Sequence, residues 1–474
     1  MTPLNDKLTK ALKPSTKALH LSANQLSKLA IDEEANVASK NTVMYDNVIN
    51  HRIRAYQKMT QEEWVAARRE AVANKDDGLP KKAPPKKVET GLKGKEEVMV
   101  LSTMLAPQRT LKAYGYTMEK PSDAEVEDCK LTQAMTQFWE ACDRCGTRFQ
   151  AFPERREKDG ALTTGGKCKY HWGRKIWPKR LPGQESEAAK YSCCNDTVGA
   201  EGCTECNTHV YKFTDIKRMS LVMPFIKTPE NDKVEPHTAV CFDCEMGYTT
   251  RGFELLRLTV VSWPSHRPII DVLVRPLGLI LDLNTQWSGI TMDQFLNAKP
   301  YDPANPKPNR RDMRIVDSPY KARELFLAHV SPTTPVLGHA LENDLNIIRL
   351  IHPAIIDTAI LYPTRSGLPY RHSLKTLAQQ HLNLDIQQGG ASGHDSYEDA
   401  RTTGELIRFK VNQIWSKLKE EGWVFRDGGV FPPLPVGLPP PTVPAAPSMV
   451  PSPRMSDPNG SAAWKRKLGE TDED

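Results

Sequence analysis

The chain carries the stretch Ala239-Val-Cys-Phe-Asp-Cys-Glu-Met246 just past its middle. The apolar and β-branched residues of this stretch predict a strand, and two further strands are expected at 255–263 and 269–275. Successive side chains of a strand point to opposite faces, so Asp243 and Glu245 share one face. Two neighbouring carboxylates in a half-buried place repel each other, and either basic side chains or a cation must offset that repulsion.

The segments that follow these strands are predicted to alternate between strands and helices. We expect a short buried strand at 335–338, a helix at 343–350, a strand at 354–358 and helices at 373–381 and 397–418. The last helix has an apolar stripe at helical spacing: Thr403, Ile407, Val411, Ile414 and Leu418. Sequential strands followed by alternating helices and strands predict an α/β domain with a mixed sheet over residues 237–420.

A second acidic segment, Gly338-His-Ala-Leu-Glu-Asn-Asp344, falls where a strand ends and a helix begins. Helix capping by Asn343 or Asp344 is the competing interpretation of this segment taken alone.

A third acidic segment is Gly393-His-Asp-Ser-Tyr-Glu-Asp-Ala-Arg401. Asp395 and Glu398 have the spacing of a capping box at the start of the last helix. Asp399 lies one turn inside that helix, whereas His394 precedes it in a loop. A loop histidine can move towards a substrate and a helical carboxylate cannot, which suits a mobile base beside a fixed ligand.

Together these segments offer four carboxylates, from Asp243, Glu245, Asp344 and Asp399. Hard oxygen ligands in that number favour Mg²⁺ or Mn²⁺ over zinc. Two such ions, roughly 4 Å apart, can clamp the attacking and leaving oxygens of a displacement at phosphorus. His394 has a side chain whose ordinary pKa, near 6.5, suits it to accept a proton from the attacking water.

Taken in order, the three segments resemble the three motifs of the DEDDh exonuclease superfamily, in its RNA exonuclease branch. The resemblance covers about 238–416 and implies a ribonuclease H-like fold, with the four carboxylates as metal ligands and His394 as general base. It also implies an RNA substrate and attack from the 3′ end with release of nucleoside 5′-monophosphates. The segment Ser288-Gly-Ile-Thr291 is similar to a family segment near the substrate cleft, and Met246 would face the terminal nucleotide.

Seven of the ten cysteines fall between Cys142 and Cys206. The polar N-terminus lacks the apolar core of a secretory signal, so we expect a reducing compartment and zinc binding instead of disulfides. The candidate ligands are Cys142, Cys145, Cys168, His171, Cys193, Cys194, Cys203 and His209, with Cys206 as a ninth. The first four would complete one tetrahedral site, and eight suffice for a second structural zinc. The sequence leaves the pairing open.

The Cys/His pattern is also similar to the cysteine-rich region that precedes the nuclease in fungal and animal RNA exonucleases. It resembles CHORD zinc modules as well, which implies a protein partner as an alternative role. Within it, the segment from Trp172 to Arg180 interleaves aromatic and basic residues. This pattern is typical of base stacking and phosphate contacts, and equally of a packed tryptophan pair with a solvated rim.

Composition divides the rest of the chain. Residues 1–96 are expected to be partly helical or disordered with a Lys/Pro linker, 97–230 to form the Cys/His region, and 430–474 to be a disordered proline-rich tail. Hydrophobic residues make up 39% and no apolar stretch is long enough for a transmembrane helix, so no membrane contact is expected. A net charge of +6 permits a polyanionic partner without requiring one.

The resulting hypothesis is an RNA 3′-end trimming enzyme, and the resemblance extends to maturation of non-coding RNAs such as RNase MRP RNA. We expect it in the nucleus and cytoplasm, with Lys81-Lys82, Lys86-Lys87 and Lys465-Arg-Lys467 as candidate nuclear signals. The alternative is a zinc-stabilised RNA- or protein-binding adaptor with an inactive nuclease domain. An inactive domain is expected to lack a ligand, and all four carboxylates are present.

Overall fold

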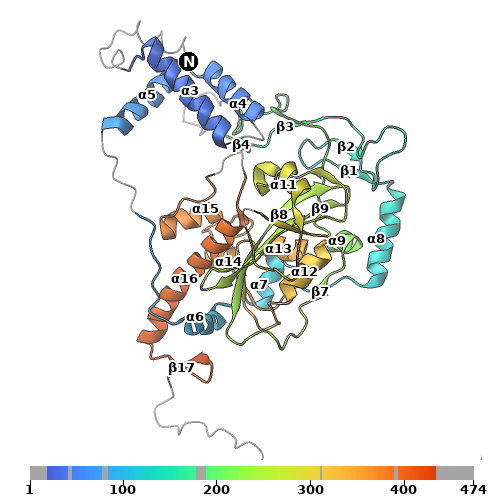
Figure 1. The fold of residues 1–474 in the computed structure, drawn as a ribbon, viewed down its shortest axis with the longest axis vertical. Helices are drawn as coiled ribbons and strands as arrows, with labels where there is room; N and C mark the ends of the chain where they lie inside the picture. The colour runs from blue at the N-terminus through green and yellow to red at the C-terminus, as the bar shows by residue number, and fades with distance from the viewer. Residues whose placement is uncertain are drawn as a thin grey trace, which may run out of the picture.

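The computed structural model describes residues 19–40, 45–76, 84–177, 188–309, 312–388 and 393–433 (Figure 1). The helices are α3 (Ala23–Lys40), α4 (Tyr45–Lys58), α5 (Gln61–Asp76), α6 (Gly94–Leu101), α7 (Gln108–Ala113), α8 (Asp123–Met135), α9 (Ile216–Val222), α10 (Thr285–Ser288), α11 (Met292–Asn297), α12 (Pro319–Leu327), α13 (Glu342–Ile347), α14 (Thr358–Leu361), α15 (Leu374–Leu377) and α16 (Ser396–Glu420), with short turns η1 (Ser102–Met104) and η2 (Ala378–Leu382). The strands are β1 (Trp139–Ala141), β2 (Arg148–Gln150), β3 (Cys168–Tyr170), β4 (Lys175–Ile176), β5 (Lys190–Tyr191), β6 (Thr204–Cys206), β7 (Ile226–Lys227), β8 (Ala239–Thr249), β9 (Gly252–Trp263), β10 (Pro268–Val274), β11 (Ile280–Asp282), β12 (Lys299–Pro300), β13 (Arg314–Val316), β14 (Val336–Gly338), β15 (Leu350–Ile351), β16 (Ile355–Asp357), β17 (Val424–Arg426) and β18 (Gly429–Phe431). The proline-rich tail from 434 onward and the lysine pairs at 81–82 and 465–467 lie outside the described residues.

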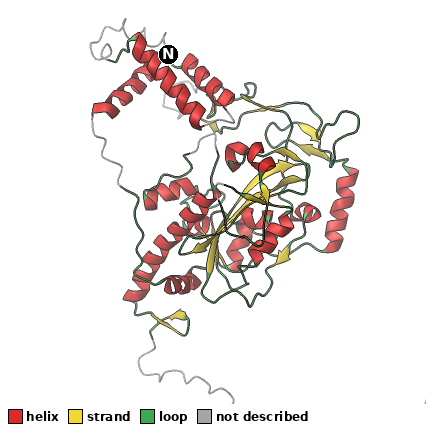
Figure 2. Ribbon diagram, in the orientation of Figure 1, coloured by secondary structure: helices red, strands yellow, loops and turns green. Residues whose placement is uncertain are grey.

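A central sheet runs in the order β12-β13-β10-β9-β8-β14-β16, with β11 paired to β8 (Figure 2). Strands β8, β9 and β10 are antiparallel neighbours, whereas β14 and β16 continue the sheet in parallel. The mixed sheet expected from the sequence is therefore confirmed. Its strands β9 and β10 fall on the segments predicted at 255–263 and 269–275.

Two cores cover the two faces of the sheet. On one face, Phe242 and Val260 pack against Phe326 of α12 and Leu345 of α13. The other face is covered by the apolar stripe of α16, as its pattern predicts, with Ile407 and Val411 fully buried and Thr403 nearly so. Because α16 lies along this second face, its first turn is brought close to β8 and β9.

The segment from α6 to α7 packs with the nuclease sheet, although the sequence analysis grouped residues from 97 onward with the Cys/His region. Val100 and Leu101 of α6 lie in the core under α16. Leu111 and Tyr116 lie in the opposite core. The segment thus wraps the edge of the sheet and contributes to both faces.

The Cys/His region consists of short two-stranded ribbons, β1-β2, β3-β6 and β4-β5. Its small core around Phe149 and Tyr211 packs against Tyr248 of β8 and Leu281 of β11. The region therefore sits directly against the end of β8 and against β11.

Helices α3, α4 and α5 form a separate group at the top of Figure 1, around the buried side chain of Trp64. Lys58 of α4 forms an ion pair with Asp196 of the Cys/His region. A helix long and apolar enough to cross a membrane is absent from the described part of the chain.

Candidate active site

Asp243 and Glu245 project from β8 on the face covered by α16. Phe242 belongs to the core under α12 and α13, and Cys241 belongs to the core under α16. Alternation along the strand then places both acids on the α16 side. A register shift follows Glu245, and Met246 lies beyond it, partly buried.

Asp344 does not cap its helix. The N-cap residue of α13 is Leu341, directly before the helix, and no side-chain hydrogen bond caps this end. Instead, the Asp344 Oδ1 atom accepts a hydrogen bond of 2.9 Å from the backbone N–H of Cys244, between the two acids of β8. The structure thus brings Asp344 to Asp243 and Glu245, which the capping interpretation does not explain.

Asp399 reaches the same place from the first turn of α16. Asp395 is the N-cap and accepts from the Tyr397 N–H, but Glu398 accepts from Gln387 N–H, so the reciprocal capping box is not formed. Asp399 Oδ2 accepts a 2.9 Å hydrogen bond from Gln387 and lies 3.7 Å from His394 Nδ1.

Burial and mutual repulsion dominate the electrostatics of this cluster. Burial, followed by the charges of Asp344, Glu245 and Asp399, raises the pKa of Asp243 well above its usual range. Burial also raises the pKa of Glu245 and Asp344 well above normal, and that of Asp399 to about 7. Without a compensating charge these groups therefore hold their protons more tightly than free carboxyl groups do.

Two oxygens of the cluster are buried without a partner among the described residues, Glu245 Oε1 and Asp399 Oδ1. A buried carboxylate oxygen that nothing satisfies is costly, and a hard cation is the ligand that suits several such oxygens together. The donor set therefore fits Mg²⁺ or Mn²⁺.

The His394 imidazole is suited to accept a proton. Burial, with a smaller contribution from Lys375, lowers its pKa below the usual value. The ring is therefore neutral at physiological pH and free to act as a base.

A buried arginine behind the acids was not anticipated from the sequence. Arg257 of β9 is paired in register with Glu245, and its guanidinium holds Asp271 through two hydrogen bonds of 2.8 and 2.9 Å. It also contacts Asp395, the N-cap of α16. Arg257 therefore partly offsets the negative cluster and fixes the start of the helix that carries Asp399. A lone arginine within an apolar strand was the signal available in the sequence.

The segment Ser288–Thr291 lies against the His394 loop. The His394 N–H donates a 2.9 Å hydrogen bond to the carbonyl of Trp287, and the two rings meet edge to face with centroids 6.0 Å apart. Gly393, at φ +74°, packs so closely that an added Cβ would lie 2.2 Å from the Gly289 nitrogen. Glycine at 393 thus permits the approach that places His394.

We expect Gly393→Ala to lower the hydrolysis rate by roughly 100-fold, since a displacement near 1 Å can have that effect. It should destabilise the fold by about 1–3 kcal/mol, because the new Cβ is both strained and in collision. Gly367→Ala is the matched control, since Gly367 has φ +65° with nothing within 4 Å of the added Cβ. Single-turnover rates and thermal melting measure both effects, and equal rates for the two variants would exclude a positioning role for Gly393.

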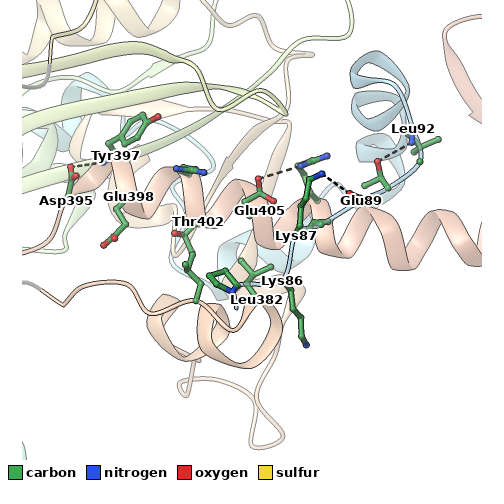
Figure 3. Close-up of a pocket in the computed structure, with 17 residues that line it drawn as sticks. Lys86, Lys87, Glu89, Leu92, Leu382, Asp395, Tyr397, Glu398, Thr402 and Glu405 are labelled. Carbon is green, nitrogen blue, oxygen red and sulfur yellow. Dashed lines mark hydrogen bonds and ion pairs between the residues drawn. The ribbon is translucent and has the colours of Figure 1, made fainter. Parts of the chain in front are cut away.

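A cavity lies apart from this cluster of carboxylates. It has a volume of about 940 Å³ and lies between the segment Pro85–Leu92 and the outer side of α16 (Figure 3). Asp395 and Glu398 line it, but none of the four clustered carboxylates does, nor does His394. Its walls carry both lysines and acids, so it is not a second carboxylate site.

The structure assembles the candidate zinc ligands into two sets of four. The first set is Cys142, Cys145, Cys168 and His209, and the second is His171, Cys193, Cys194 and Cys203. His209, not His171, therefore completes the first set, and Cys206 belongs to neither. The reason is the pairing of β3 with β6, which aligns Cys168 with Cys206 and brings His209, three residues further on, close to the Cys168 thiol. His171 lies beyond the end of β3 and approaches Cys193 instead.

Both histidines are oriented as metal ligands are. His209 Nδ1 lies 3.3 Å from Cys145 Sγ, and its Nε2 faces the Gly165 carbonyl at 3.3 Å. His171 Nδ1 lies 3.4 Å from Cys194 Sγ, and its Nε2 faces the Ala200 carbonyl at 3.1 Å. A backbone carbonyl on the second ring nitrogen is the usual support of a ligating histidine.

The thiols of each set lie close enough together to share one cation. The Cys168 thiol, 3.7 Å away, lowers the pKa of Cys142 to about 3, and the same contact raises the pKa of Cys168. Burial raises the pKa of Cys194 to about 12. Three thiols and one imidazole within 4.8 Å of one another fit a tetrahedral zinc in each set.

Comparison with known proteins agrees with the motifs. A family profile described as RNA exonuclease 3 N-terminal domain matches residues 1–77. RNA exonuclease 3 of Emericella nidulans is 44% identical, over 91% of this chain and 70% of that protein. RNA exonuclease 3 of Schizosaccharomyces pombe is 31% identical, over 86% of this chain and 63% of that protein. Among solved structures, the Neurospora crassa Pan2 catalytic unit (protease and nuclease domain) is 27% identical, with a TM-score of 0.33, over 42% of this chain and 31% of that one. The resemblance to RNA exonucleases is confirmed, and the chain belongs to the RNA exonuclease 3 family.

Proposed function

We propose that this protein is an exoribonuclease that removes nucleotides from the 3′ end of RNA by hydrolysis and releases nucleoside 5′-monophosphates. The observation that carries the proposal is the convergence of Asp243, Glu245, Asp344 and Asp399 beside a neutral His394. Relatives named RNA exonuclease support the choice of RNA as substrate.

The four carboxylates would hold two Mg²⁺ or Mn²⁺ ions, which when bound polarise the phosphate and the attacking water. The His394 imidazole accepts the proton of that water as its oxygen bonds to phosphorus. The bond from phosphorus to the 3′ oxygen of the preceding nucleotide then breaks. The departing nucleotide keeps its 5′-phosphate, and the 3′ oxygen of the shortened RNA takes up a proton from water to become a new 3′-hydroxyl.

Arg257 and Gln387 act on the carboxylates and not on the substrate. Arg257 holds Asp395 at the start of α16, and Gln387 orients Asp399 through a 2.9 Å hydrogen bond. Both therefore position the ligand that comes from the helix.

The two Cys/His sets would each hold one structural zinc, closed by four protein ligands. Within the cell, the enzyme would act in 3′-end maturation of non-coding RNAs such as RNase MRP RNA, in the nucleus and cytoplasm. A protein partner of the Cys/His region is compatible with this role.

A single-stranded RNA labelled at its 5′ end tests the activity. With Mg²⁺ we expect a ladder of products shortened stepwise from the 3′ end, and with excess EDTA no shortening. The same RNA labelled at its 3′ end should release a labelled nucleoside 5′-monophosphate as the first product, and a 3′-phosphate should block the reaction. RNA that is bound but stays full length under all conditions would indicate the adaptor alternative.

A further inference from the structure

A small cavity lies where the Cys/His region meets the nuclease sheet. Its volume is about 230 Å³, and four aromatic side chains line it, Tyr170 and Trp172 from the Cys/His region and Tyr248 and Trp287 from the nuclease. Trp172 and Trp287 are 42% and 46% exposed, whereas Trp263 in the nuclease core is 4% exposed. Large aromatic surfaces are thus presented to solvent on both walls of one cavity.

The two walls are held together by Arg144. Its guanidinium lies between the rings of Tyr170 and Tyr248, 5.0 and 5.1 Å from their centroids. It also forms a 2.6 Å ion pair with Asp282 of β11. Stacked and ion-paired contacts of this kind fix the Cys/His region on the sheet. The cavity between them is therefore preformed, which lowers the entropy lost when a ligand binds.

The cavity adjoins the candidate active site through one residue. Trp287 lines the cavity, and its carbonyl accepts the His394 N–H at 2.9 Å. The Trp287 ring also meets the His394 ring edge to face. A ligand against Trp287 is thus separated from His394, the proposed general base, by a single indole ring. The cavity is therefore expected to bind part of the same substrate.

The lining suits an uncharged base and not a phosphate. Asp143 is among the residues that line the cavity, and the Arg144 charge there is already matched by Asp282. Asp143 and Asn284 offer polar atoms that can meet the edge of a base. The volume is below the roughly 300–1,000 Å³ of pockets for drug-sized ligands, which leaves room for one base. Arg174 and Lys175, both exposed, follow Trp172 in the sequence and add positive charge beside this wall.

We propose that Trp172 and Trp287 form a stacking site for one base of single-stranded RNA, upstream of the 3′-terminal nucleotide. This inference rests on the proposed function, because that function assigns the terminal nucleotide to the carboxylates. A base paired in a duplex cannot enter the cavity, so the site selects unpaired 3′ ends. Stacking is indifferent to sequence, since every base has a π-face.

Abasic substitution in the RNA tests the site directly. Binding of a labelled RNA of about ten nucleotides is measured by fluorescence anisotropy, in an Asp243→Asn background that prevents turnover. An abasic unit is placed at successive positions from the 3′ end. We expect one upstream position, when abasic, to weaken binding by roughly 5- to 150-fold, the usual range for a stacked base.

Trp172→Ala should weaken binding of the intact RNA by a similar factor and add nothing at that abasic position, because each change removes the same contact. Trp172→Phe should restore most of the affinity. Trp177→Ala is the matched control, since Trp177 lies in the same segment and is 74% exposed but does not line the cavity. It should change the affinity by less than about twofold.

Additive losses from Trp172→Ala and the abasic unit would overturn the stacking site, as would an equal loss from Trp177→Ala. If Trp172→Ala fails to fold, the abasic series on the parent protein decides, and no position-specific loss refutes the site. If the wild type hydrolyses RNA but the losses from Trp172→Ala and the abasic unit are additive, the stacking site is refuted and the proposed function stands. If the two losses are not additive but the wild type does not hydrolyse RNA, the proposed function is refuted and a base-binding site remains.

Discussion

Asp344→Asn is expected to abolish RNA hydrolysis while leaving the metal-free fold at least as stable as the wild type. Losing a metal ligand removes several kcal/mol of transition-state stabilisation. About 4 kcal/mol corresponds to roughly a thousandfold in rate, so we expect a loss of at least that size. Single-turnover hydrolysis with Mg²⁺ measures it.

The stability follows from the contacts of Asp344. Asparagine keeps an oxygen that can accept the hydrogen bond from Cys244 N–H, so this contact survives. The substitution also removes one acid from a cluster in which burial raises the pKa of Asp344 well above normal. The folded wild type holds this proton more tightly than the unfolded chain does. Its metal-free stability therefore falls as pH rises above about 4, the usual pKa of an aspartate. The Asn variant should lose less stability over the same rise in pH.

Glu342→Gln provides the matched control on the same helix. Glu342 is buried like Asp344, but it pairs with Arg371. We expect this variant to retain hydrolysis while losing roughly 1–3 kcal/mol of stability with its ion pair. Addition of Mg²⁺ should raise the melting temperature of wild type and Glu342→Gln, but not that of Asp344→Asn. Hydrolysis by Asp344→Asn at the wild-type rate would exclude Asp344 as a ligand.

The strand and helix that carry most of the site were predictable because burial fixes their periodicity. Asp243 and Glu245 alternate with Phe242 and Cys244, so their shared face follows from the sequence alone. The predicted helix at 397–418 lies within α16, since its apolar stripe faces the sheet. Local periodicity was thus sufficient wherever one side of an element is buried.

What could not be predicted depends on contacts between distant segments. Capping by Asp344 was a reasonable local expectation, and only the approach of Cys244 from β8 shows another role. The compensating charge of Arg257 becomes visible once its register with Glu245 is known. Likewise, α6 packs under α16 because Val100 and Leu101 find a core formed by the later strands. The spacing of residues along the sequence does not show which distant segments come into contact.

The Cys/His region illustrates the same limit with functional consequences. His171 follows Cys168 at ligand spacing, yet the β3-β6 ribbon brings His209 to that thiol instead. The first set is more deeply buried than the second, and its core packs on Tyr248 beside the cavity at the active site. Metal in the first set should therefore support the nuclease wall of the cavity, whereas metal in the second should hold His171, which lines the opposite wall beside Trp172.

Cys168→Ser is accordingly expected to halve the zinc content and to unfold the ribbons that meet the nuclease sheet. Structural zinc contributes on the order of 10 kcal/mol to the folding of small domains, far more than the short strands here can replace. Wild type should bind two zinc ions per chain, one for each set of four ligands. Elemental analysis gives the count, and limited proteolysis should cut Cys168→Ser within residues 138–213 while residues 237–431 persist.

Cys206→Ser tests whether the effect belongs to the metal set or to the loss of any thiol. Cys206 is the cross-strand partner of Cys168 but lies in neither set, so this variant should keep both zinc ions and resist proteolysis. Cys203→Ser should lose one zinc, from the more exposed set, and a chelator should empty that set first in the wild type. Because the first set supports the cavity wall at Tyr248 and the second set holds His171 beside Trp172, both Cys168→Ser and Cys203→Ser should weaken RNA binding. Equal zinc contents in Cys168→Ser and Cys206→Ser would show that the first set does not bind the metal.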